Sequence, residues 1–396
     1  MSCRLRIGVL AGEASGDILG SRVLAALKSR YDEVIVEGMG GPLMQAQGLD
    51  SLFPMERLSV MGIVEPCKRL PELLRIRAAV LRHFRDKPPD LFLGIDSPDF
   101  NLRLEENLRQ FGVPTAHLVS PSVWAWRRGR IGKIKRSVDL MLCLFPFETA
   151  IYQQHGIPVS FVGHPLADEI AERIDQAAAR VDLGLAPAGK LLALLPGSRG
   201  SEVRMLAPLF LQAADMLWQR DRRLSFVIPA ANDLRRKELL RLLQEYPQLP
   251  VTLLSGQSRK AMAAADAILL ASGTASLEAA LLKRPMVVAY RMAALSWFLL
   301  SRMLKTEYVA LPNVLAGKAL VPELLQGAAT PAAMVSALLP LLGVEAEATA
   351  ARQVQEFDVI HRQLQRDFSV QAADALMHLV ASGREAGVGI GNERPV

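Results

Sequence analysis

The chain has 396 residues, 51% hydrophobic and 22% charged, which is enough material for two buried cores. No stretch approaches the 18 or so unbroken apolar residues of a membrane span, and the apolar segment 7–11 is followed by Glu13, unlike a signal peptide, so we expect a cytoplasmic protein. The three cysteines are widely separated, and the histidines and acidic residues form no metal-binding pattern, so we expect reduced cysteines, no metal and no cofactor. Despite a net charge of +6, aromatic residues make up only 6% and no nucleic-acid motif appears, so no nucleic-acid partner is expected.

Short apolar segments alternate with longer amphipathic ones, which is typical of parallel α/β sheets. The first series of strands is expected near 5–10, 34–37, 91–95, 115–119, 140–144 and 159–162. The second series is expected near 191–195, 225–228, 251–254, 267–270 and 286–289, and the pattern turns helical after Pro322. We predict two Rossmann-like domains that face each other across a cleft, with C-terminal helices. The predicted boundaries are 1–166 and 191–345 for the domains, 167–190 for a linker, 346–382 for the C-terminal helices and 383–396 for a disordered tail.

The loop after the first strand carries Gly12 and Gly16 without the G-x-G-x-x-G spacing of dinucleotide-binding proteins. Its carboxylates, Glu13 and Asp17, would also repel a pyrophosphate. Glu37 ends the second predicted strand and fits the ribose-binding acid of such proteins, so a nicotinamide dehydrogenase remains an alternative. The first domain is better suited to a hydroxylated acceptor.

Seven basic residues lie within 68–87, against two acidic ones. Apolar residues accompany this segment and the stretch just before it, and those with a predicted lipid-facing role are Val60, Met61, Ile63, Leu70, Leu73 and Leu74. A basic face beside an apolar one suits an anionic membrane surface. An ordinary solvated helix with a stripe of core residues explains the same pattern, and the sequence leaves both interpretations open.

Asp96 follows the strand predicted at 91–95, in the segment Gly-Ile-Asp-Ser-Pro-Asp-Phe-Asn. Ligands of open α/β sheets bind at the carboxyl ends of strands, and a carboxylate there can take a proton from an incoming hydroxyl. We therefore predict that Asp96 is a general base. Asp99 is the alternative base, although its position also suits a helix cap.

Two loops of the second domain have the pattern of strand, small-residue loop and helix. The segments are 191–202 and 269–278. Free main-chain N–H groups and the helix dipole favour an anion at such loops, and Arg199 adds a guanidinium that matches phosphate oxygens. The predicted nucleoside-diphosphate contacts are Ser198, Arg199, Ser272, Gly273, Thr274 and Ala275, with Glu278 as the acceptor of ribose hydroxyls and Arg291 as a weaker candidate. The alternative interpretation of Arg199 is a surface residue on a turn, without a role in binding.

Six separated motifs resemble those of the lipid-A-disaccharide synthase family, in the same order along the chain. They begin at residues 11, 60, 94, 120, 195 and 311 and read AGEASGD, VMGIVE, GIDSPDFN, SPSVWAWR, LPGSRGSE and LPN. The resemblance covers about residues 5–325. It implies a GT-B glycosyltransferase that joins UDP-2,3-diacylglucosamine to 2,3-diacylglucosamine 1-phosphate (lipid X) through a β(1→6) link and releases UDP, with inversion and without a metal.

The resemblance further implies catalytic positions and partners. Asp96 matches the family's proposed base, and Glu13 and Asn313 match positions at its active centre, although a loop cap and a turn explain these two equally well. Trp124 and Trp126 are candidates for an acyl pocket or for the core. Attachment to the cytoplasmic face of the inner membrane and a homodimer through the C-terminal helices are also implied. A UDP-sugar epimerase and a non-catalytic UDP-sugar-binding protein are the alternative functions.

Overall fold

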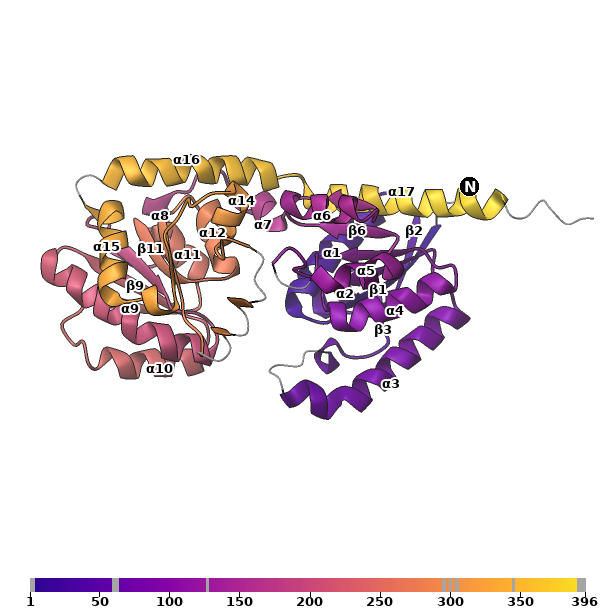
Figure 1. Cartoon of the computed structure of the whole chain (residues 1–396), viewed down its shortest axis with the longest axis horizontal. Coiled ribbons are helices and arrows are strands. Elements are labelled where there is room, and N and C mark those ends of the chain that lie inside the picture. The colour runs from indigo at the N-terminus through magenta and orange to yellow at the C-terminus, as the bar shows by residue number, and fades with distance from the viewer. Residues whose placement is uncertain are drawn as a thin grey trace, which may run out of the picture. The chain divides into compact units, whose positions relative to one another are not determined.

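A computed structural model describes residues 4–58, 64–125, 128–293, 297–298, 301–302, 306–343 and 346–389. The chain divides into two compact units (Figure 1). Unit 1 consists of Met1–Asp168 with Leu364–Val396, and unit 2 consists of Glu169–Gln363. Each unit contains one fully parallel sheet, so the predicted pair of Rossmann-like domains is confirmed.

Unit 1 contains a seven-stranded sheet with the order β3-β2-β1-β4-β5-β6-β7. The strands are β1 (Arg4–Ala11), β2 (Glu33–Met39), β3 (Leu49–Ser51), β4 (Leu91–Ile95), β5 (Thr115–Leu118), β6 (Leu140–Cys143) and β7 (Val159–Phe161). The central strands β1 and β4 are apolar and buried because helices cover both faces of the sheet, as is usual for parallel sheets.

The helices of unit 1 pack on the two faces of its sheet. They are α1 (Ala14–Lys28), α2 (Pro42–Ala46), α3 (Val64–Asp86), α4 (Pro98–Gln110), α5 (Ile131–Ser137), α6 (Thr149–Gln154), α7 (Pro165–Glu169) and α17 (Phe368–Gly389). Helices α1 and α17 share one apolar cluster with the sheet, whereas α3 and α4 contribute to a cluster on the other face.

The C-terminal helix α17 belongs to unit 1, although more than 190 residues separate it from the rest of that unit. Its residues Phe368 and Leu376 are buried in the cluster that includes α1. The Asp168 carboxylate accepts hydrogen bonds from the main-chain N–H groups of residues 366, 367 and 368 at 2.7–3.1 Å and so caps the beginning of α17. From the sequence we expected one separate segment of C-terminal helices at 346–382, but α16 (Ala346–Leu364) belongs largely to unit 2 and α17 to unit 1. Helix α17 also continues to Gly389, whereas a disordered tail was expected from residue 383.

Unit 2 contains a six-stranded sheet with the order β10-β9-β8-β11-β12-β13. The strands are β8 (Leu191–Leu195), β9 (Ser225–Ala230), β10 (Val251–Ser255), β11 (Ala267–Ala271), β12 (Met286–Tyr290) and β13 (Glu323–Leu325). The helices are α8 (Gln176–Asp182), α9 (Gly200–Arg220), α10 (Asp233–Leu243), α11 (Ser258–Ala264), α12 (Thr274–Leu281), α14 (Leu311–Ala316), α15 (Pro331–Leu342) and α16 (Ala346–Leu364). Helices α9, α10 and α15 lie together, as do α8, α11 and α12 (Figure 1).

The segment 167–190, which we expected to be a linker, is largely built into unit 2. Arg180 on α8 is buried, and its guanidinium binds the Asp266 carboxylate at 2.8 Å and the main-chain carbonyl of Ala264 at 3.0 Å. These contacts of a buried guanidinium connect the segment to the unit 2 sheet, so it does not act as a free connection.

All eleven predicted strands are present, and most boundaries agree within two residues. The strands that the sequence did not indicate are β3 and β13, each three residues long and at an edge of its sheet. A three-residue strand has too few positions to show a period, and β13 lies where a helical pattern was expected. None of the described helices is both long and apolar enough to cross a bilayer.

The strand order reverses direction between β1 and β4 in unit 1 and between β8 and β11 in unit 2. At such a switch point the loops that follow the two strands diverge and leave a crevice at the carboxyl edge of the sheet. The loops that carry Glu13, Asp96, Arg199 and the segment 272–275 follow these four strands. Each predicted site thus lies where a ligand of its sheet is expected to bind.

Candidate functional site

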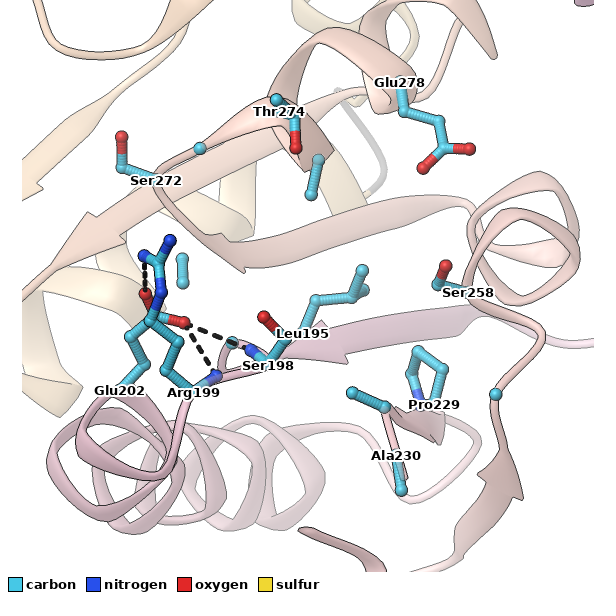
Figure 2. A pocket seen from close by; sticks show the side chains of 16 residues that line it. Leu195, Ser198, Arg199, Glu202, Pro229, Ala230, Ser258, Ser272, Thr274 and Glu278 are labelled. Carbon is cyan, nitrogen blue, oxygen red and sulfur yellow. Dashed lines mark hydrogen bonds and ion pairs between the residues drawn. The ribbon is translucent and has the colours of Figure 1, made fainter. Parts of the chain in front are cut away.

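A cavity of about 620 Å³ opens at the carboxyl edge of the unit 2 sheet (Figure 2). Its wall includes Leu195, Gly197, Ser198, Arg199, Glu202, Pro229, Ala230, Gly256, Ser258, Ser272, Gly273, Thr274, Ala275 and Glu278. Seven of the eight residues predicted to contact a nucleoside diphosphate line this one cavity. The eighth, Arg291, lines a separate hollow with Met205 and Gln326.

The loop after β8 leads into α9, whose N-terminus forms one side of the cavity. Here the Glu202 carboxylate accepts hydrogen bonds from the main-chain N–H groups of Ser198 at 3.1 Å and Arg199 at 3.2 Å. The same carboxylate pairs with the Arg199 guanidinium at 3.0 Å, and the Arg199 side chain is 80% exposed. The end of the helix that favours an anion thus already holds a carboxylate from the chain itself (Figure 2). Glu202 was not predicted as part of the site, because the N-cap residue is Arg199 and not the Ser or Thr of the usual capping-box signature.

The loop after β11 leads into α12 and forms another part of the wall. Gly273 is the N-cap residue of α12 at φ 148°, a conformation that disfavours any side chain, and no side-chain hydrogen bond caps the helix there. The first N–H groups of α12 are therefore not satisfied by a capping side chain, as an anion-binding helix end requires.

Glu278 lies one turn into α12, on the opposite side of the cavity from Arg199 (Figure 2). Its carboxylate accepts a hydrogen bond from Arg259 Nε at 2.6 Å, and Arg259 also contacts the Glu169 carboxylate at 3.3 Å. The ion pair fixes the direction of the Glu278 side chain. Arg259 was missed in the sequence because nothing in its local pattern connects it to a residue nineteen positions further on.

Asn313 is buried, and its side chain is used within its own loop. Its amide nitrogen donates to the Val321 carbonyl at 2.9 Å and to the Glu323 carboxylate at 2.8 Å, and its oxygen accepts from the N–H groups of Leu320 and Val321. These hydrogen bonds explain the burial of Asn313 by a structural role, the stabilisation of a turn. Its predicted catalytic role rests on the family resemblance alone.

In unit 1, Glu13 and Asp96 follow the neighbouring strands β1 and β4. Glu13 is exposed at the N-cap of α1 and makes no side-chain capping bond. Asp96 is half-buried and, with Ser97, adopts a positive φ of 50° and 44° respectively. Asp99, the alternative base, lies in the first turn of α4 and pairs with Arg130 at 2.5 Å. Asp96 directly follows β4, whereas the Asp99 carboxylate is engaged by Arg130, and the role of Asp96 as base stays a prediction.

The other acidic residues of this edge have structural partners. Asp17 is buried and accepts hydrogen bonds from the N–H groups of Gly41, Leu43 and Met44 at 2.9–3.0 Å. Glu37 pairs with Arg6 and His83. Because these partners bind the Glu37 carboxylate within unit 1, the observation that supported a nicotinamide dehydrogenase has another explanation.

Strained backbone continues into the loop after β5. Val119 and Ser122 have φ of 81° and 49°, and a β-branched residue such as Val119 is rarely found there. Such strain tends to occur where a site requires a specific loop shape. Trp124 in this loop packs edge-on against Phe147, with 5.1 Å between the ring centroids. Trp126 lies outside the described residues.

The apolar residues of the basic helix α3 divide into buried and exposed ones. On α3, Ile76 and Val80 are buried in the core, as expected for an ordinary solvated helix with a stripe of core residues. Leu70 and Leu74 are 53% and 45% exposed, and Leu73 is half-buried. The remaining predicted lipid-facing residues, Val60, Met61 and Ile63, lie outside the described residues.

In the part of the chain that the structure describes, no three or more side chains of His, Cys, Asp or Glu are grouped so as to hold a metal ion.

Known proteins with similar structures share the fold of both units. The UDP-GlcNAc 2-epimerase from Neisseria meningitidis, solved with UDP-GlcNAc, has a TM-score of 0.62 at 13% identity, over 96% of this chain and 100% of that one. The glycotransferase of kitacinnamycin has a TM-score of 0.62 at 13% identity, over 95% and 99%. MurG from Acinetobacter baumannii has a TM-score of 0.54 at 15% identity, over 97% and 99%. At these identities the likeness shows the GT-B architecture and nothing finer.

Sequence comparison is more specific. The lipid-A-disaccharide synthase of Pseudomonas aeruginosa strain LESB58 is 54% identical over 380 residues, which cover 96% of this chain and 99% of the relative. That of Saccharophagus degradans is 54% identical over 387 residues, 97% and 99% of the two chains. The family model described as lipid-A-disaccharide synthetase matches residues 7–376. The chain therefore belongs to the lipid-A-disaccharide synthetase family, whose members are glycosyltransferases.

Proposed function

We propose that the chain transfers the sugar of UDP-2,3-diacylglucosamine to the 6-hydroxyl of 2,3-diacylglucosamine 1-phosphate, forming the β(1→6) lipid A disaccharide 1-phosphate and UDP. The observation that carries the proposal is the unit 2 cavity, where two helix N-termini, Arg199 and Glu278 meet. The chain also belongs to a family of glycosyltransferases. Two helix ends and a guanidinium suit a diphosphate, and a carboxylate at the far side suits ribose hydroxyls.

The reaction requires a base on the acceptor hydroxyl and stabilisation of the departing diphosphate. Asp96 accepts the proton of the 6-hydroxyl while the oxygen attacks C1 of the donor sugar from the face opposite the diphosphate, so the anomeric configuration inverts. The bond between C1 and the diphosphate oxygen breaks, and the negative charge on UDP is neutralised by Arg199 and the N–H groups of the α9 and α12 N-termini. This arrangement needs no metal ion.

The test is to incubate the purified protein with both lipid substrates and to follow UDP release together with disaccharide formation. Asp96→Asn keeps the shape of the side chain and removes its proton affinity, so UDP binding should persist while transfer falls by about a hundredfold or more. Asp99→Asn is the matched control and should retain most activity. Near-normal turnover of Asp96→Asn would contradict the assignment of the base.

The same assay separates the alternatives. A UDP-sugar epimerase would convert the donor without the acceptor and form no disaccharide. A non-catalytic UDP-sugar-binding protein would bind UDP and release none from the donor. No feature of the site favours either of these over transfer.

The proposal includes attachment to the cytoplasmic face of the inner membrane, because both substrates carry acyl chains. Support comes from Leu70 and Leu74, which are exposed on α3 next to the exposed Arg75. An apolar and basic helix surface of this kind suits anionic lipid.

A further inference from the structure

Asn101 joins the two strand ends that carry the predicted catalytic carboxylates of unit 1. It lies in the first half of α4 and is completely buried. Its amide nitrogen is within hydrogen-bond distance of three main-chain carbonyl oxygens: 2.7 Å from Asp96, and 3.3 Å from both Ile95 and Leu10. Leu10 belongs to β1, which leads into the Glu13 loop, so one side chain contacts the ends of both strands.

The Asp96 carbonyl lies where the chain leaves the sheet, one residue beyond the last pair of β4. The last residue pairs between β1 and β4 are Leu10 with Gly94 and Ala11 with Ile95. Immediately afterwards Asp96 and Ser97 turn into the left-handed region. A positive φ at non-glycine residues is unfavourable and persists only where the surroundings enforce it. Asn101 is placed to enforce it, since it holds the carbonyl of Asp96 itself.

Asn101 is held in turn by a closely packed environment. A Cβ added at Gly94 would overlap Glu105 Oε1 and would lie 3.1 Å from Asn101 Cβ, so the absence of a side chain at Gly94 makes room for both residues. Glu105, one turn after Asn101, contacts His117 Nδ1 on β5 at 2.7 Å, and both side chains are fully buried. The buried face of α4 therefore ties β1, β4 and β5 together beneath the Asp96 loop.

We infer that Asn101 is a positioning residue for the transfer reaction: its amide nitrogen fixes the Asp96 loop relative to the Glu13 loop and so places the base against the acceptor hydroxyl. The inference rests on the proposed function of Asp96. Asn101 itself is buried and does not touch substrate.

The test compares kcat and KM in the disaccharide assay for Asn101→Ala, Asn101→Asp and Gly94→Ala. A base displaced by about 1 Å can slow a reaction by about a hundredfold, so kcat of Asn101→Ala should fall by about tenfold to a hundredfold. KM for both substrates should change by less than about threefold, because the loss concerns the transition state. Gly94→Ala should lower kcat in the same way, because the new methyl group displaces Glu105 and Asn101.

Asn101→Asp separates positioning from simple loss of packing. An ionised carboxylate would repel the three carbonyl oxygens, whereas a protonated one donates a hydrogen bond, so kcat of this variant relative to wild type should rise as the pH is lowered. The alanine variant should show no such recovery. Asn107→Ala is the control on the same helix, since that exposed amide only bonds the carbonyl of Arg103, and it should behave as wild type.

The outcomes distinguish the inference from the proposed function. Absence of disaccharide formation by the wild-type protein would contradict the proposed function. Full activity of Asp96→Asn would contradict the assignment of Asp96 as the base. With both intact, wild-type kcat in Asn101→Ala would overturn the inference. A loss of activity that matches the fraction of unfolded protein, measured by circular dichroism at the assay temperature, would overturn it as well.

Discussion

Glu202 and Arg199 form an ion pair at the N-terminus of α9, where the donor's diphosphate is proposed to bind. Their charges have opposite consequences for an incoming anion. The guanidinium attracts it, while the carboxylate occupies two of the N–H groups that it would use. A bound diphosphate must therefore share these donors with Glu202 or displace it.

Arg199→Ala should weaken UDP binding and slow transfer by about a hundredfold or more, because a charge-assisted contact to the leaving group is lost. Glu202→Gln should instead tighten UDP binding by about fivefold at low salt, since the amide retains the capping-box geometry without the negative charge. Titration calorimetry with UDP measures both effects, with Glu245→Gln, outside the cavity, as the control. Equal or weaker binding by Glu202→Gln would mean that Glu202 only caps α9.

The Glu148 carboxyl group lies beneath the strained loop after β5. It is buried and accepts a hydrogen bond from the Phe145 N–H at 3.2 Å. Burial raises the pKa of Glu148 to about 8, and this outweighs the hydrogen bonds to Phe145, Ser120 and Trp124, which favour the ionised form. Glu148 is thus largely protonated at neutral pH, and Cys143 and Tyr152 are the other titratable groups near it.

This pKa predicts a dependence of stability on pH. The unfolded chain releases the Glu148 proton near 4.5, whereas the folded chain retains it to about 8. Its contribution is therefore fully present below pH 4.5 and is lost as the pH rises through this window, by up to about 1.4 kcal/mol per unit. Glu148→Gln does not titrate, so its free energy of unfolding should rise relative to wild type between pH 5 and pH 8. Urea unfolding of both proteins at several pH values checks this, and a difference that stays constant with pH would contradict it.

Helix α3 has a buried face and an exposed face. Its core face holds Ile76 and Val80, and its outer face exposes Leu70 and Leu74 beside basic residues. Of the predicted lipid-facing set, the structure describes Leu70, Leu73 and Leu74.

Leu70→Ser together with Leu74→Ser should reduce binding to anionic vesicles, because apolar insertion is lost. Salt above about 0.1 M should weaken wild-type binding without abolishing it, since screening shortens electrostatic attraction to about 10 Å or less. Vesicle co-sedimentation measures both effects. Leu234→Ser, at an exposed leucine of α10, is the control. Unchanged binding by the double variant would place the lipid-facing surface elsewhere.

At the scale of the whole molecule, unit 1 is assembled from both ends of the chain. Helix α17 closes its apolar cluster through Phe368 and Leu376, and Arg30 on the segment after α1 pairs with Asp374 at 3.0 Å. The proposed nucleotide cavity lies wholly in unit 2. Damage to α17 should therefore separate acceptor chemistry from nucleotide binding.

Phe368→Ala should lower the stability of unit 1 by about 3–5 kcal/mol, as large-to-small changes in a core do, and leave the affinity for UDP within about twofold of wild type. Hydrogen exchange resolved by mass spectrometry should show faster exchange in β1 and α1 than in β8. Gln371→Ala, at an exposed position of α17, is the control. Weakened UDP binding in parallel with the loss of protection would show that the two units unfold together. A homodimer through the C-terminal helices stays a prediction, which light scattering of the wild-type protein can test.

The sequence by itself determined the two parallel sheets, eleven strands and the loops of both sites, because apolar runs, glycines and helix starts are local features. It indicated Arg199 and Asp96 by their positions after strands, and Glu278 by its position one turn into the following helix. The tertiary structure alone decided which partners these residues have, since Arg259 reaches Glu278 and Asp168 caps α17 across 19 and 200 residues respectively. It also decided that α17 completes unit 1, and that Asn101 joins β1 to β4. Such contacts depend on which strands become neighbours in the folded sheet, and a local sequence pattern does not predict the order of the strands.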